Sequence, residues 1–182
     1  MPQPQSSSSS SLIRGLGMAL FIIAFDQLTK WYIFTLLTGS DSGSFWQSER
    51  LPAMHFISMT PFLNLVMVWN RGVSFGMFGG LEHSPIIFSA VAVIISIGLI
   101  WWLRRVSTLG NALAIGAVMG GAIGNTFDRL RFDAVFDFLD VFIGNYHWPA
   151  FNVADSAISI GAIMLIWFTF KEEQELKGKN HA

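Results

Sequence analysis

The chain has 182 residues, room for one domain, and 52% of them are hydrophobic while only 13% are charged. In soluble domains about a quarter of the residues are charged, so this composition excludes an ordinary soluble protein and favours a membrane protein. The formal net charge of -1 argues against a nucleic-acid-binding surface, and the absence of cysteine excludes disulfides, thiolate catalysis and Cys-ligated zinc.

The N-terminal part predicts one transmembrane helix after a short polar segment. Residues 1–11 are rich in Pro, Gln and Ser, a composition typical of disorder. Residues 12–37 are mostly apolar and exceed the roughly 20 residues that a bilayer core requires. No small-residue cleavage site follows the first apolar run, so we expect a membrane span rather than a signal peptide. Within it, Asp26 and Lys30 are four residues apart, on one helical face where they can pair.

The middle of the chain predicts a strand and two further spans. Residues 39–59 contain no motif, whereas residues 61–70 are dense in β-branched and aromatic side chains and predict a strand. Residues 84–103 and 106–127 carry no charge except in the intervening Arg104-Arg105 pair, and each predicts a span. The third span repeats small residues at every fourth position, which lets a neighbouring helix approach closely. These are Ala112, Gly116, Gly120 and Gly124.

The stretch of residues 135–155 brings two carboxylates toward the membrane. It begins as an alternating, strand-like run with Asp137 between two phenylalanines, and it ends with Asn152 and Asp155 at the start of a fourth span, residues 152–170. Residues 171–182 form a polar, charged tail. A carboxylate at the mouth of a membrane segment costs free energy, which makes it a functional hypothesis. We expect Asp133 and Asp140 to be solvated, and His147 has no role that the sequence predicts.

Lys and Arg near the span ends predict the orientation of the chain. One side of the membrane holds six Lys or Arg residues, at positions 14, 104, 105, 171, 177 and 179. The other side holds four, at positions 50, 71, 129 and 131. We therefore expect both termini in the cytoplasm, with the polar residues gathered at the outer face.

These polar residues suit three kinds of protein. Two adjacent carboxyls share a proton and can activate water for amide hydrolysis without a metal. Intramembrane acids also relay protons in transporters, and polar residues can hold helices together in a scaffold protein. A transporter would place its acids deeper, in repeats that the sequence lacks. A scaffold role leaves the gathering at one face unexplained. The four histidines are scattered, so the sequence predicts no metal site.

Five segments in this order resemble bacterial signal peptidase II, an aspartic membrane protease that processes lipoproteins. They are DQLTK at residues 26–30, NRGVSF at 70–75, GGAIGNTFDR at 120–129, VFDF at 135–138 and FNVAD at 151–155. The resemblance implies four transmembrane helices, a small β-sheet cradle and an amphipathic segment over the site. It also implies cleavage of lipid-modified prolipoproteins just before the diacylglyceryl cysteine. We expect the protein to be a monomer, to contact membrane lipids and to need no cofactor.

The resemblance also implies the roles of individual residues. Asp137 and Asp155 correspond to the catalytic pair, and Asp26 with Lys30 to a structural ion pair. The positions that bind substrate or support the site are Asn70, Gly72, Asn125, Asp128, Arg129, Asn152 and Ala154.

Overall fold

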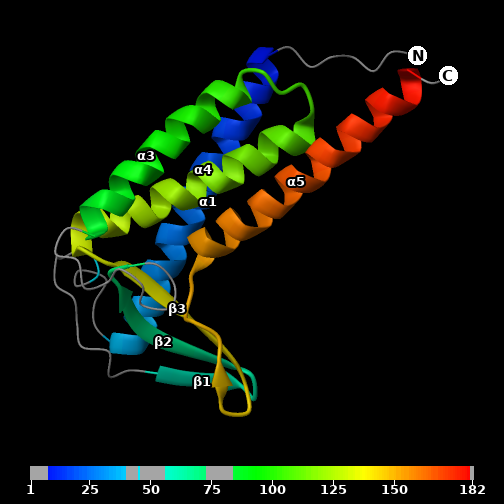
Figure 1. The fold of residues 1–182 in the computed structure, drawn as a ribbon. Coiled ribbons are helices and arrows are strands. Elements are labelled where there is room, and N and C mark those ends of the chain that lie inside the picture. Colours follow the sequence, from blue (N-terminus) through cyan, green and yellow to red (C-terminus); the bar gives the residue numbers. More distant parts are fainter. Residues whose placement is uncertain (1–7, 40–44, 46–55, 73–83, 181–182) are drawn as a thin grey trace.

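A computed structural model describes residues 8–39, 45, 56–72 and 84–180 of the chain. The helices are α1 (Ser8–Thr38), α3 (Ser84–Leu103), α4 (Leu109–Phe132) and α5 (Val153–Asn180). The strands are β1 (Phe56–Thr60), β2 (Leu63–Asn70), β3 (Val135–Ile143) and β4 (Tyr146–His147). The four helices form a bundle with the sheet at one end, and the start of α1 and the end of α5 both lie at the opposite end (Figure 1).

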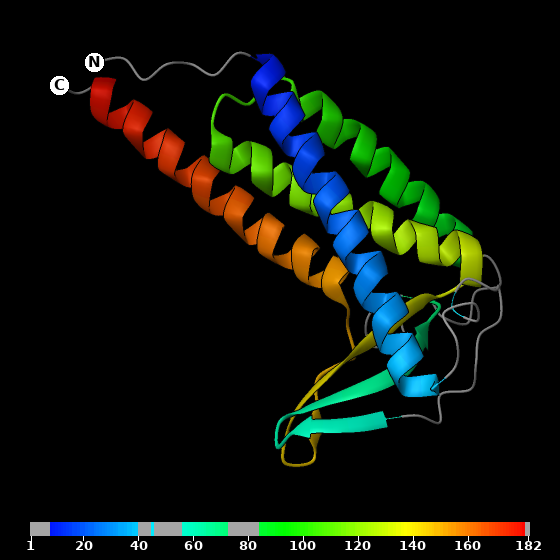
Figure 2. The ribbon, with the colours of Figure 1, turned by 180° about the vertical axis from the view of Figure 1, so that it is seen from behind.

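The centre of the bundle is α4, which packs against α1, α3 and α5. Figure 2 shows the bundle from behind, with α1 crossing in front of α4. A Cβ atom at Gly120 would lie 2.6 Å from the carbonyl oxygen of Ala19, so α1 and α4 approach this closely only because Gly120 has no side chain. The small residues of α4 therefore serve helix packing, as their spacing predicts.

Three of the described helices are long and apolar enough to cross a bilayer, over Ser9–Thr38, Ser84–Leu103 and Val153–Glu175. The fourth, α4, is not among them although the sequence predicts a span there. Its residues are largely small or polar, and more than half of them are buried by the surrounding helices. A helix enclosed in this way exposes little surface to lipid and needs less hydrophobicity than its neighbours.

The sheet is antiparallel with the strand order β1-β2-β3-β4. Its long strand β3 continues directly from the end of α4, where Asp133 ends the helix with a left-handed φ of 57°. The faces of the strands pack on the ends of α1 and α4 through a cluster of buried apolar side chains. These are Phe34, Leu37, Phe45, Leu65, Met67, Phe132, Phe136 and Phe138. The cluster fixes β3 against the bundle.

The structure differs from the sequence-based expectation at several element ends. α1 begins at Ser8, within the segment expected to be disordered, and α5 continues through the expected tail to Asn180. β1 lies in a segment where the sequence indicates no element. None of the described residues forms the amphipathic segment implied over the site.

Asp140 was expected to be solvated, and this expectation is wrong. The residue is buried, with 8% exposure; its carboxyl accepts a hydrogen bond from Asn64 Nδ2 at 3.0 Å and contacts His147 Nδ1 at 2.8 Å. Asp133 is exposed and forms an ion pair with Arg71. The polar partners of Asp140 come from strands on both sides of β3, which the linear sequence does not reveal.

Candidate active site

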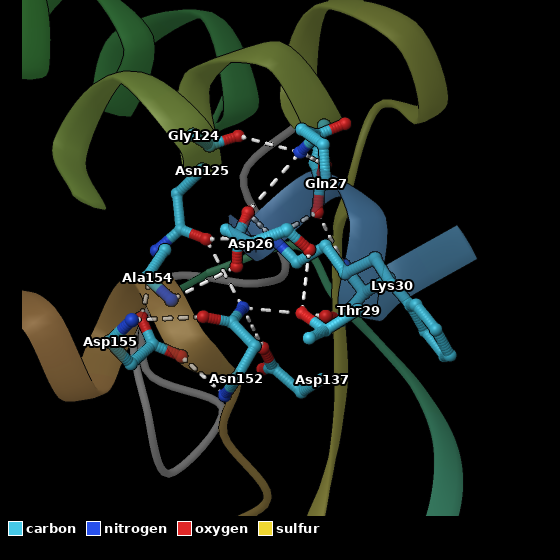
Figure 3. A network of polar contacts seen from close by, with 12 residues as sticks. Asp26, Gln27, Thr29, Lys30, Gly124, Asn125, Asp137, Asn152, Ala154 and Asp155 are labelled. Atoms are coloured by element: carbon cyan, nitrogen blue, oxygen red, sulfur yellow. Dashed lines mark hydrogen bonds and ion pairs between the residues drawn. The ribbon is translucent and has the colours of Figure 1, made fainter. Parts of the chain in front are cut away.

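Asp137 lies on β3 and is almost completely buried, with 1% exposure. Both of its carboxylate oxygens accept hydrogen bonds from side-chain amides. Asn152 Nδ2 donates to Oδ1 at 2.7 Å, and Asn70 Nδ2, from the neighbouring strand β2, donates to Oδ2 at 3.1 Å. Two amides from different elements thus hold the carboxyl in one orientation; Figure 3 shows the contact with Asn152.

Asp155 lies in the first turn of α5, where Asn152 caps the helix. The Asp155 backbone N–H donates to Asn152 Oδ1 at 2.9 Å, and the Asn152 backbone N–H donates to Asp155 Oδ2 at 3.2 Å. This reciprocal pair is a capping box, with aspartate in the position where glutamate or glutamine is usual. The Asp155 carboxyl therefore lies at the positive end of the α5 dipole, where the Asn152 backbone N–H holds it in place.

Asn152 and Asn125 connect the two carboxyls. Asn152 contacts Asp137 through its side chain and Asp155 through its backbone, so one fully buried residue bridges the pair. Asn125, on α4, donates from Nδ2 to Asp155 Oδ1 at 2.8 Å and accepts from Asn152 Nδ2 at 3.1 Å. The structure therefore brings together four residues that the sequence places on three separate elements (Figure 3).

The electrostatics of the pair favour one shared proton. Burial, and then the negative charge of Asp155, raise the pKa of Asp137 well above its ordinary value, while the hydrogen bond from Asn70 opposes the shift. Ionising both carboxyls would place two like charges in a site with little solvent. The arrangement can therefore present one carboxylate and one carboxylic acid to a bound substrate.

Asp26 and Lys30 form the expected ion pair, and Asp128 joins them. Lys30 Nζ lies 2.7 Å from Asp26 Oδ2 and 2.8 Å from Asp128 Oδ2, and all three side chains have no exposed surface. Gln27 Nε2 donates to Asp128 Oδ1 at 2.9 Å. The sequence indicates the pair by its i, i+4 spacing, whereas the third member and Gln27 meet only through the packing of α1 on α4.

A cleft of about 290 Å³ opens beside the two carboxyls. Its polar end is lined by Asn70, Gly72, Asn125, Arg129, Asp137 and Asp155. Its apolar walls come from three helices: Phe88, Val91, Ala92 and Ile95 of α3, Val118 and Ala122 of α4, and Ile158 of α5. Arg129 Nε is buried there without a hydrogen-bond partner, so this guanidinium can donate to a bound molecule. Among the residues described, no three His, Cys, Asp or Glu side chains are grouped to hold a metal ion.

A model of the family described as signal peptidase (SPase) II matches residues 18–171, most of the chain and all of the site residues above. The chain belongs to the signal peptidase II family. It is thus an aspartic peptidase and a bacterial multi-pass membrane protein.

Curated relatives and solved structures agree with this family assignment. The chain is 38% identical over 168 residues to the lipoprotein signal peptidase of Syntrophus aciditrophicus, covering 90% of this chain and 96% of that protein. It is 33% identical over 165 residues to the enzyme of the same name from Anaplasma phagocytophilum, with the same shares covered. A solved bacterial membrane enzyme at 2.3 Å resolution superposes with a TM-score of 0.71 at 29% identity, covering 88% of this chain and 90% of the other.

Proposed function

We propose that this signal peptidase II removes the signal peptide from lipid-modified prolipoproteins, cleaving just before the diacylglyceryl cysteine, with Asp137 and Asp155 as its catalytic pair. The observation that carries the proposal is the bridge made by Asn152, which holds both carboxyls at the polar end of an apolar cleft. The relatives' shared name, lipoprotein signal peptidase, supports the choice of substrate.

The surroundings of the two carboxyls suggest which one holds the proton. Asp155 is assigned as the base of the pair, because its carboxyl lies in the first turn of α5 and is oriented by the Asn152 backbone N–H and by Asn125 Nδ2, both of which donate to it. Asp137 is the protonated member, because it is buried on a strand and its pKa is raised. Asp155 then takes a proton from a water molecule as that water attacks the scissile carbonyl, while Asp137 donates its proton to the carbonyl oxygen.

The second half of the reaction reverses these roles. The tetrahedral intermediate collapses, the C–N bond breaks, and the proton held by Asp155 passes to the departing amine, while Asp137 recovers a proton from the intermediate's hydroxyl. The amides of Asn152 and Asn70 are placed to stabilise Asp137 during the interval in which it is ionised. They contribute most when that charge is present, which is how a preorganised donor lowers a barrier.

The cleft suggests how the substrate lies. Its apolar walls come from the membrane-spanning helices and suit the hydrophobic signal peptide or the acyl chains of the lipid. Arg129, with its unpartnered Nε, stands at the polar end, where a peptide carbonyl or an ester of the lipid would accept from it. Gly72 also lines this end and lets a substrate backbone approach closely.

The proposed topology puts both termini in the cytoplasm and the catalytic pair at the periplasmic face. It rests on the Lys and Arg distribution. The start of α1 and the end of α5 both lie at the end of the bundle opposite the sheet, which is compatible with it (Figure 1).

The test uses purified protein, a lipid-modified prolipoprotein and the unmodified precursor. We expect cleavage of the modified substrate only. Asp137→Asn and Asp155→Asn should each abolish cleavage while the protein stays folded, since Asn has the shape of Asp but exchanges no acidic proton. The double variant should be no worse than either single, because the pair acts as a unit.

The matched control is Asp140→Asn, since Asp140 is another buried acid on the same strand but does not line the cleft. It should remain active, and EDTA should have no effect. An active Asp155→Asn enzyme, or loss of activity in EDTA, would show that the chemistry is assigned wrongly.

A further inference from the structure

We propose that Asp26, Lys30 and Asp128 form a clamp that sets the separation of the two catalytic carboxyls. The clamp acts through the backbone residue directly before each catalytic aspartate, so its members are positioning residues and do not touch the substrate. The inference rests on the proposed roles of Asp137 and Asp155.

The first arm of the clamp is Asp26 on α1. Its Oδ2 pairs with Lys30, and its Oδ1 accepts a hydrogen bond from the backbone N–H of Ala154 at 2.9 Å. Ala154 is fully buried in the first turn of α5, and the next residue is Asp155. Asp26 therefore fixes the start of α5 relative to α1 at the point from which Asp155 projects (Figure 3).

The second arm is Asp128 on α4. Its Oδ2 accepts a hydrogen bond from the backbone N–H of Phe136 at 3.1 Å, and the next residue on β3 is Asp137. The same oxygen lies 2.8 Å from Lys30 Nζ. The two arms are thus equivalent: each buried acid holds the amide of the residue that precedes one catalytic aspartate.

Lys30 joins the two arms. One ammonium group contacts both acids, so the distance between the amides of Ala154 and Phe136 is set by a short chain of charged hydrogen bonds. Lys30 Nζ also lies 3.3 Å from Asn125 Oδ1. Because that oxygen is held by donors, the amide group of Asn125 must point its Nδ2 toward Asp155, as observed.

Stability alone is a poor reason for such a cluster. Burying charged groups costs several kcal/mol per ion, and well-packed apolar residues often stabilise a protein as well or better. An apolar core would not, however, accept hydrogen bonds from the two amides. The cluster thus supplies geometry at two backbone points, and a displacement of 1 Å in an active site can lower the rate about 10²-fold.

The test is Gly124→Ala, which changes no charge. A Cβ atom at Gly124 would lie 3.0 Å from Asp26 Oδ2, so the carboxylate must shift by a few tenths of an ångström. The control is Gly110→Ala in the same helix, where the new Cβ would lie 2.8 Å from the ring of Phe168. Gly110 is fourteen residues earlier, about 21 Å along the helix axis. Lys30→Arg, which keeps the charge and changes the spacing, is a second perturbation of the clamp.

The measurements are the amount of folded protein, kcat, KM and the pH profile of cleavage. The high-pH limb of the profile reports loss of the shared proton, and its position depends on the repulsion between Asp137 and Asp155 and hence on their separation. The other charged groups that act on Asp137 are Lys30 and Asp128, and Arg129 also interacts with the pair. All of these charges are unchanged in Gly124→Ala and in Lys30→Arg.

We expect Gly124→Ala to lower kcat about tenfold, with KM little changed and the high-pH limb moved, because a few tenths of an ångström is a fraction of the 1 Å displacement above. Lys30→Arg should move the limb too, and Gly110→Ala should alter only stability. A normal profile in the two clamp variants, or activity lost only in proportion to folded protein, overturns the clamp. If Asp137→Asn or Asp155→Asn were active, the catalytic assignment itself would fail, which is a separate result.

Discussion

Asn152 has two separable functions, and two substitutions at this position test them. Its Oδ1 caps α5, and its Nδ2 lies 2.7 Å from Asp137 Oδ1. Asn152→Ala removes both contacts. Asn152→Ser keeps an oxygen that can cap the helix, since Ser and Asn are comparable N-cap residues, but it removes the amide donor.

The contact that each substitution removes sets the size of the expected effect. Loss of an N-cap costs about 1 kcal/mol, so Asn152→Ala should unfold about 2–4 °C below Asn152→Ser in a chain of this length. A hydrogen bond to a charged group contributes about 1.5–3 kcal/mol, and Asp137 is charged after it has donated its proton. At about 1.36 kcal/mol for each factor of ten, both variants should lose roughly 10- to 150-fold in kcat/KM.

The assay is cleavage of the lipid-modified prolipoprotein in detergent, with thermal unfolding measured on the same preparations. The reasoning predicts unequal stability and equal loss of activity. Wild-type kcat/KM in Asn152→Ser would refute the role of the amide at Asp137. Equal unfolding temperatures for the Ser and Ala variants would refute the cap.

Two further predictions concern stability and topology. Between the ordinary pKa of an aspartate and the raised pKa of Asp137, the folded state binds more protons than the unfolded state, so this residue lowers stability as pH rises through that interval. The Asn side chain of Asp137→Asn does not titrate, so the unfolding temperature of this variant should rise relative to that of the wild type as the pH rises. A difference in unfolding temperature that is independent of pH would contradict the burial argument. Reporter fusions after Arg105 and after Lys177 should read cytoplasmic and one near Ser42 periplasmic, and a periplasmic signal after Arg105 would invert the proposed orientation.

The sequence by itself determined the class of the protein and the identity of its conspicuous polar residues. Hydropathy predicts the limits of α3 without error, because an uncharged run of this length bounded by charges has few alternatives in a bilayer. The i, i+4 spacing of Asp26 and Lys30 predicts their ion pair, since it depends only on local helical geometry. The five ordered segments predict the signal peptidase II family, to which the chain belongs.

Only the tertiary structure decided how these residues meet. The bond of Asp128 to Lys30 joins helices about a hundred residues apart in sequence, and the amides of Ala154 and Phe136 reach their acids only when α5 and β3 are docked. Asp140 is buried for the same kind of reason, because its partners lie on the neighbouring strands. Local patterns report helical and strand faces, whereas the contacts between separate elements depend on packing that no short window of sequence contains.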